Sequence, residues 1–420
     1  MGIKQQIKKL LLKFLSSIVF TFFDLLDYVL CIVYSYLDDL FEGSSPSSTS
    51  CYCFRKEQEN NDDQVSTTLY RRQSLFRDMG CFELKTKRMK RSKQSSSEFG
   101  NRWSDCGCES CVAWIKNGDD LRLHLVVQDP AADMENSKHK FNENVIFLHG
   151  FISSSSLWTE TVFCNLSEDT KKKYKLFAID LLGFGRSPKP RDCLYTMRDH
   201  LEMIEKSVIF PFGLSSFHLV AHSMGSIIAL ALAAKYPQHI KSITLIAPPY
   251  FPSSSDEDGS LLTLRKVADK RLWPPLVFGA SFMSWYEHLG RTICFIICRN
   301  HRIWEFLLRL LTWRRDLQFS IMDITRHTHH SAWHTMHNVI CGGAKFMEEY
   351  LTILRNARVK FTIFQGDEDQ VLPVECSYNI KMRVPHADVI IIPKTSHSTI
   401  ILRQIKELTK DLEGIWMSCH

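Results

Sequence analysis

Residues 217–235 read FHLVAHSMGSIIALALAAK, and this stretch decides the fold. An apolar, β-prone run stops abruptly at residues 221–225, Ala-His-Ser-Met-Gly, and a run of small and apolar residues typical of a helix follows. The pattern A-x-S-x-G at a strand-to-helix turn is a variant of the nucleophile elbow, which places Ser223 on a sharp bend. Because such a bend crowds the residues two before and two after the serine, both must be small, and Ala221 and Gly225 meet that requirement. The stretch therefore predicts a nucleophilic serine at the end of a buried strand.

A nucleophilic serine needs a base, and the base needs an acid that orients it. Residues 361–366 and 387–393 both read as buried strands, and each is followed by a loop with a candidate residue. The loop after the second strand holds His397, which we expect to be the base. The loop after the first strand holds both Asp367 and Asp369, and the pattern G-x-x-D-x-x-x-P favours Asp369 as the orienting acid. The order serine, acid, histidine is the one that follows an elbow of this kind.

Two backbone N–H groups should bind the oxyanion that forms when the serine attacks, and one belongs to the residue after the nucleophile, Met224. An apolar strand over residues 145–148 ends in His149-Gly150-Phe151. We expect the N–H group of Phe151 to be the second donor, because Gly150 lets the backbone come close to a ligand. We expect His149 to organise this loop rather than to transfer protons.

One more strand and loop, residues 176–187, carry the signature D-x-x-G-x-G-x-S. With this signature in place, residues from about 112 to 415 resemble an α/β-hydrolase, since all these segments stand in the expected order. The resemblance implies an α/β fold with a mostly parallel central sheet flanked by helices, a helical cap insertion and no cofactor. A narrower resemblance, to the plant Bodyguard-type hydrolases, rests on the basic-then-apolar N-terminus and on WSDCGCESC at residues 103–111.

Bodyguard-type hydrolases are linked to cuticle formation and are often described as probable lysophospholipases. The resemblance therefore implies a carboxylic ester hydrolase that acts on acyl esters of lipid-like substrates, or that transfers the acyl group to a cutin precursor. It also implies a secretory route to the plasma membrane or cell wall of the plant epidermis. The alternative is a small-molecule receptor or scaffold of α/β-hydrolase type with slow turnover or none. The sequence leaves open the exact substrate, the choice between hydrolysis and transfer, the oligomeric state and the protein partners.

Composition divides the 420 residues into five segments. We expect an apolar membrane anchor or signal segment at 1–42, a disordered Ser-rich and basic linker at 43–105, hydrolase core at 106–250, a helical cap at 251–355 and the rest of the core at 356–420. The net charge is +6, and much of the positive excess lies before residue 100. The catalytic region therefore gives no reason to expect nucleic acid as a partner.

The first segment has lysines at positions 4, 8, 9 and 13, followed by a long apolar run over residues 14–37. The run is long enough to span a membrane. Asp24 and Asp27 near its middle argue against a simple span, and polar or small residues recur at steps of three and four along it. A membrane span or signal anchor, an interfacial amphipathic helix and a cleaved signal peptide all remain open, and each places the protein at a membrane or in the secretory route.

The chain has 14 cysteines, of which three cluster at Cys106, Cys108 and Cys111, with Cys51 and Cys53 upstream. A zinc site needs a fourth ligand at suitable spacing, and none is evident in the sequence. We therefore favour disulfides or lipid attachment and predict no metal. The histidines between residues 327 and 337 also lack the acidic partner of a zinc-protease motif.

The cap insertion is rich in bulky apolar residues. Most of them must pack within the cap, but a few would line an acyl-chain tunnel above the serine. Our candidates for this substrate-binding role are Trp273, Phe278 and Trp285.

Overall fold

The computed structural model describes residues 3–42, 65–69, 102–113, 121–130, 143–252, 260, 262–263, 284–313, 315 and 317–419. Seven strands form one sheet in the order β1-β3-β2-β4-β5-β6-β7. Their bounds are β1 Leu125–Gln128, β2 Glu143–Leu148, β3 Tyr174–Ile179, β4 Phe217–His222, β5 Ile240–Ile246, β6 Lys360–Gly366 and β7 Asp388–Ile392. Only the β1–β3 pair in this sheet is antiparallel, and the other five pairs are parallel, which confirms the predicted mostly parallel sheet.

The central strands are apolar throughout because both faces of the sheet are covered. In β4 every residue is buried. Leu219 and Ala221 pack into the core on one face, whereas Val220, between them, packs into the core on the other face. Strand β2 alternates in the same way, with Ile146 on the first face and Phe147 on the second.

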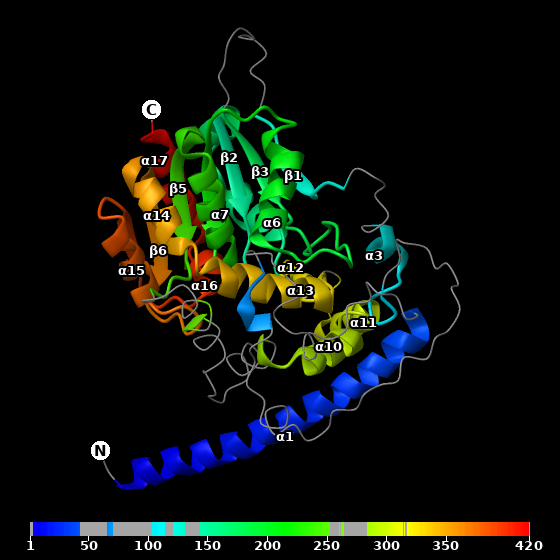
Figure 1. Cartoon of the computed structure of the whole chain (residues 1–420). Helices are drawn as coiled ribbons and strands as arrows, with labels where there is room; N and C mark the ends of the chain where they lie inside the picture. Colours follow the sequence, from blue (N-terminus) through cyan, green and yellow to red (C-terminus); the bar gives the residue numbers. More distant parts are fainter. Residues whose placement is uncertain are drawn as a thin grey trace.

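Helices on each face complete the core (Figure 1). On the first face lie α6 Met197–Ile204, η4 Glu205–Ile209, α7 Met224–Lys235, α14 Met347–Asn356 and α15 Glu375–Arg383, whose buried residues belong to one apolar cluster. The second face is covered by α4 Ser156–Trp158, η3 Thr159–Phe163, α16 Thr399–Leu402 and α17 Ile405–Met417. Two short helices, α5 Glu168–Lys173 and η5 Pro237–His239, precede β3 and β5. Helix α7 is apolar all round because it is buried all round, from Met224 to Ala233.

The predicted cap lies between β5 and β6, and the structure describes helices in it. Its described helices are α10 Glu287–Ile296, α11 His301–Thr312, α12 Phe319–Asp323, α13 His329–Thr335 and η6 Met336–Cys341. The predicted boundary at residue 355 is one helix too late. Helix α14 contacts α7 directly, and its Met347, Leu351 and Leu354 are buried in the same cluster as α7, so α14 belongs to the core.

Part of the expected linker is packed against the cap. Residues 67–69 form the short helix η2, and Leu69 is fully buried against Trp333. The Ser66 N–H group donates a hydrogen bond to Asn338 Oδ1 at 2.9 Å, and Thr68 Oγ1 bonds His337 Nδ1 at 2.9 Å. The expectation of disorder across 43–105 is therefore wrong for residues 65–69, because one buried leucine and two hydrogen bonds hold them against the cap.

The segment 102–113, which includes α3 Glu109–Ala113, lies beside the cap rather than on the sheet (Figure 1). Cys108 and Cys111 contact His301, at the start of α11. The core therefore begins after this segment, and the boundary predicted at residue 106 is too early.

Helix α1 spans Ile3–Glu42 and lies along α10 (Figure 1). Its part Ile18–Glu42 is the one described helix that is long and apolar enough to cross a membrane. The face toward α10 is partly polar: Asp27 is buried, and its Oδ1 accepts hydrogen bonds from the N–H groups of His288 and Leu289 at 2.8 and 2.9 Å. Further along, Asp38 forms a two-fold ion pair with the guanidinium of Arg291 at 2.6 and 2.7 Å.

Candidate active site

Ser223 lies on the turn between β4 and α7 with φ 50° and ψ −122°, a backbone conformation that non-glycine residues rarely adopt. The turn is held closely against the end of β2. A side-chain carbon added at Gly225 would lie 2.5 Å from the carbonyl oxygen of His149 and 2.8 Å from that of Leu148. The small residue at this position is therefore required by contact with β2 as well as by the turn itself.

The structure brings the three predicted catalytic residues together. His397 Nε2 lies 2.9 Å from Ser223 Oγ, and His397 Nδ1 lies 2.8 Å from Asp369 Oδ2. His397 is in the loop after β7, and Asp369 is in the loop after β6, so both come from the carboxyl edge of the parallel sheet. A hydroxyl, an imidazole and a carboxylate in this order can pass a proton from the serine to the histidine while the acid fixes the ring.

Asp369 is well suited to remain ionised. Its Oδ1 accepts hydrogen bonds from the N–H groups of Val371 and Leu372, both at 2.8 Å, and Gln365 donates to Oδ2 at 3.2 Å. Burial alone would raise its pKa, but the hydrogen bond and charge of His397 together with the two backbone donors lower the pKa below its ordinary value. The rival Asp367 is exposed to solvent.

His149 is buried, and its side chain forms hydrogen bonds that fix the loop after β2. Its Nδ1 donates to the Gly150 carbonyl oxygen at 2.7 Å, and its Nε2 accepts from the Leu181 N–H group at 2.9 Å. Because a carbonyl can only accept and an amide can only donate, these partners select the neutral Nδ1–H tautomer. Burial also lowers the pKa of this imidazole. The ring therefore ties the loop after β2 to the loop after β3.

The two expected oxyanion donors are on segments that flank the serine. A side-chain carbon on Gly150 would lie 3.2 Å from Ser223 Cβ, so this loop passes directly over the nucleophile. Phe151 follows it, and its ring packs edge-on against Phe184 with centroids 5.7 Å apart. Met224 is the first residue of α7, where a backbone N–H group has no acceptor within the helix.

His222 is a residue near the site that the sequence did not single out. Its Nε2 donates to the His397 carbonyl oxygen at 3.1 Å, and the two rings lie 4.9 Å apart. Burial and the neighbouring His397 lower its pKa to about 3, so the ring is neutral at ordinary pH. This residue positions the backbone of the histidine loop, and its only signal in the sequence is its place directly before the serine.

The structure describes one of the three predicted substrate-binding residues, Trp285. Trp273 and Phe278 lie outside the described residues. Trp285 packs in the cluster between α10 and α1, with Tyr286, Leu289 and Phe23. A role for these three residues in substrate binding stays a prediction.

Within the described ranges, two groups of side chains have donor atoms close enough to hold a metal ion. One consists of Cys106, Cys108, Cys111 and His301, and the other of Cys294, Cys298 and His327. Neither includes a member of the serine site. The sequence showed no fourth ligand for the first cysteine cluster, and the structure supplies His301.

The fold and this site define an α/β-hydrolase. A family model described as alpha/beta hydrolase fold matches residues 143–269. The probable lysophospholipase BODYGUARD 4 of Arabidopsis thaliana is 51% identical over 96% of this chain and 97% of its own length, and BODYGUARD 5 of the same plant is 46% identical over 96% and 94%. Among solved structures, MenH from S. aureus aligns with 70% of this chain and 98% of its own, at 16% identity and a TM-score of 0.49. The chain belongs to the Bodyguard family and is an ester hydrolase.

Proposed function

We propose that this chain hydrolyses acyl esters of lipid-like substrates, with a lysophospholipid as the leading candidate, and that Ser223, His397 and Asp369 carry out the reaction. The observation that carries the proposal is the hydrogen-bonded chain from Ser223 Oγ through His397 to Asp369. The names of the two Bodyguard relatives described above suggest the substrate class.

In the first half of the reaction, Ser223 Oγ attacks the ester carbonyl carbon while His397 Nε2 takes its proton. Asp369 keeps the proton of His397 Nδ1 in place and stabilises the imidazolium that forms. The tetrahedral intermediate then breaks its bond to the alcohol oxygen, which leaves with the proton from His397. The products of this half are the free alcohol, here a glycerophospho group, and an acyl ester of Ser223.

In the second half, a water molecule gives a proton to His397 and attacks the acyl ester, which releases the fatty acid and restores Ser223. The N–H groups of Phe151 and Met224 stabilise the oxyanion in both halves. A hydroxy-fatty acyl group in place of water would give acyl transfer by the same steps. The resemblance to Bodyguard-type proteins supports our proposal that this chemistry serves cuticle formation at the plant epidermis.

We infer that the substrate reaches the site from a membrane surface. Helix α11 of the cap exposes large apolar side chains along one stripe, among them Phe306, Leu310 and Leu311, which are 65%, 59% and 74% exposed. Trp313, at its end, is 90% exposed. So large an unpaired apolar face costs free energy in water and is typical of a surface that contacts lipid or protein.

Helix α1 also supports contact of the protein with a membrane surface. Its exposed large apolar residues recur at helical spacing over most of its length: Ile7, Leu11, Phe14, Ile18, Phe22, Leu25, Val29, Val33, Tyr36 and Leu40. Four lysines within its first 13 residues suit the anionic lipid headgroups that such a helix meets. We propose that α1 lies in the membrane interface rather than across the bilayer, because a span would separate Asp27 from the two N–H groups that it binds on α10.

The test of the enzyme proposal uses the full chain in detergent, as wild type, Ser223→Ala and Ser226→Ala. Ser226 is the matched control, since it lies three residues away in the first turn of α7 and its hydroxyl donates to the Ala221 carbonyl oxygen. Each protein is treated with a fluorophosphonate probe and then offered a lysophospholipid and a monoacylglycerol. We expect labelling and repeated turnover in the wild type and in Ser226→Ala, and neither in Ser223→Ala. A folded wild type that is not labelled, or that turns over once and retains its product, would favour the receptor or scaffold alternative.

The test of the membrane proposal compares two double variants in binding to anionic phospholipid vesicles. Phe306→Asp/Leu310→Asp removes two apolar groups one turn apart on α11, and Tyr378→Asp/Met382→Asp makes the same change on exposed apolar residues of α15. We expect at least a roughly tenfold weaker partition for the α11 variant alone, since burying each such side chain contributes about 1.5–3 kcal/mol. Equal partition of the two variants would show that α11 does not touch the lipid.

A further inference from the structure

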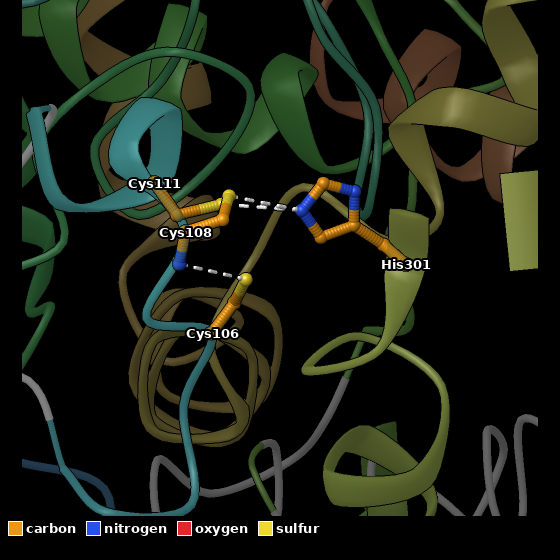
Figure 2. A group of neighbouring side chains, drawn as sticks. All are labelled: Cys106, Cys108, Cys111 and His301. Atoms are coloured by element: carbon orange, nitrogen blue, oxygen red, sulfur yellow. Dashed lines mark hydrogen bonds between the residues drawn. The ribbon is translucent and has the colours of Figure 1, made fainter. Parts of the chain in front are cut away.

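Four potential metal ligands from two distant parts of the chain meet beside the cap (Figure 2). They are the Cys3His group, made of Cys106, Cys108, Cys111 and His301. The cysteines come from the segment before the core, and His301 is the first residue of α11. Their four donor atoms lie within 4.8 Å of one another.

The separations match those of a tetrahedral zinc site. With Zn–S bonds of about 2.3 Å and a Zn–N bond of about 2.0–2.1 Å, a sulfur and a nitrogen bound to one tetrahedral ion are about 3.5–3.6 Å apart. His301 Nε2 lies 3.4 Å from Cys108 Sγ and 3.5 Å from Cys111 Sγ. Cys108 and Cys111 also have the C-x2-C spacing that is common among structural zinc ligands.

The imidazole of His301 is oriented for a metal. Its Nδ1 lies 2.9 Å from Glu305 Oε1, one helical turn further along α11. A carboxylate can only accept this hydrogen bond, so Nδ1 carries the proton and the lone pair of Nε2 faces the cysteines. Histidines that bind metals usually donate their other N–H group to a carboxylate or a carbonyl in this way.

We propose that the Cys3His group binds one structural zinc ion. Three sulfur ligands and one imidazole in a tetrahedral arrangement favour zinc over magnesium, calcium or manganese, which prefer oxygen. A disulfide explains the group less well, because it would use two of the three cysteines and give no role to the lone pair of His301 Nε2, which faces the sulfur atoms. The ion can enter through a pocket that Cys106 and Cys111 line together with Cys294, Cys298 and His327.

The bound ion would hold together parts of the chain that the hydrophobic core does not join. Helix α11 begins at His301 without a side-chain cap, and the three thiolates with the ion leave one negative charge at this N-terminus, where the helix dipole favours it. The cysteine segment also reaches α1, because Trp103 Nε1 donates to Asp38 Oδ1 at 2.6 Å. Zinc would therefore fix the cap to both the cysteine segment and the interfacial helix.

The test measures zinc and free thiols in the full chain, purified in detergent without chelators. The variant Cys108→Ser/Cys111→Ser removes two ligands, and Cys164→Ser/Cys419→Ser removes two cysteines that belong to neither metal-ligand group. We expect the ligand variant to hold one zinc ion per chain fewer than the wild type, and the control variant to hold the same amount. A wild type without zinc, the same zinc content in the ligand variant and the wild type, or a disulfide between Cys108 and Cys111 in the wild type would overturn the proposal.

A milder variant tests the zinc site even if the loss of two ligands prevents folding. Glu305→Gln keeps all four ligands but weakens the hydrogen bond that orients His301. We expect a chelator to remove zinc from it at about 10–100-fold lower concentration than from the wild type. Cobalt added to the metal-free proteins should give the visible absorption of a tetrahedral thiolate site. Release of zinc at the same chelator concentration from both proteins, or no such absorption in the wild type, would contradict the site.

Discussion

Replacing Asp27 with alanine should weaken the contact between α1 and the start of α10. Asp27 caps the N-terminus of α10, although it lies on α1. Its side chain accepts hydrogen bonds from the second and third residues of α10, His288 and Leu289. Tyr286, at the ordinary cap position, makes no side-chain cap bond. Losing a cap costs about 0.5–2 kcal/mol, and a hydrogen bond to a charged group contributes about 1.5–3 kcal/mol. Because both bonds share one oxygen and the freed N–H groups can meet water, we expect a loss of about 2 kcal/mol.

Amide hydrogen exchange at His288 and Leu289 measures this loss directly, in the full chain bound to vesicles. A loss of about 2 kcal/mol in the local opening free energy should make both amides exchange about 30-fold faster, since 1.4 kcal/mol is a factor of ten. Asp39→Ala is the matched control, because Asp39 is an exposed aspartate on the same helix. If the two amides exchange equally in Asp27→Ala and Asp39→Ala, then α1 does not cap α10 on the membrane, and the reasoning for an interfacial helix fails.

Three further predictions concern the serine site. Asp369→Asn should lower kcat by about 10⁴-fold with KM little changed, because the imidazole of His397 loses the acceptor that fixes its tautomer; steady-state ester hydrolysis measures it. Gly150→Ala should lower kcat by about 10²–10³-fold, because the added carbon would lie 2.9 Å from His222 Nδ1 and 3.2 Å from Ser223 Cβ and would displace an oxyanion donor; an unchanged kcat would remove this loop from the oxyanion site. The pKa of Asp369 is lower in the folded protein, so its stabilising effect should be complete above the unfolded pKa of about 3.9 and be lost as the pH falls through the folded pKa. Urea unfolding of wild type and Asp369→Asn at neutral and acidic pH should therefore give free energies that differ at neutral pH and converge in acid.

The serine site could be predicted because its geometry is encoded in short contiguous stretches. A strand, a tight turn and a helix around Ser223 need small residues at fixed positions, and the structure places Gly225 against the end of β2 as that requirement implies. The two loops that carry Asp369 and His397 each follow an apolar run that reads as a buried strand. Parallel strands then bring the two loops to one edge of the sheet, so the topology completes what the local patterns indicate.

The contacts of the cap could not be predicted in the same way, because their partners are far apart in the sequence and follow no period. Cys108 and His301 are 193 residues apart, and Asp27 and His288 are 261 apart. Asp27 argues against a membrane span when it is considered alone, and only the structure reveals the two N–H groups that it binds. The short helix η2 was missed for a related reason, since three residues are too few to show any periodicity.

The contact between α1 and α10 bears on whether the first 42 residues can be a cleaved signal. Apart from its polar contacts with Asp27 and Asp38, the surface that α1 covers around α10 is apolar: Tyr286 and Leu289 are 3% and 6% exposed, and Ile293 packs beside them. Removing α1 would expose these side chains and add them to the apolar stripe that α11 already presents to solvent. The cap without α1 would therefore carry a larger apolar surface than the intact chain, at a cost of about 25 cal/mol for each Å² uncovered. We expect the mature protein to retain α1, and intact-mass measurement on the protein from its native tissue should find residues 3–42 present.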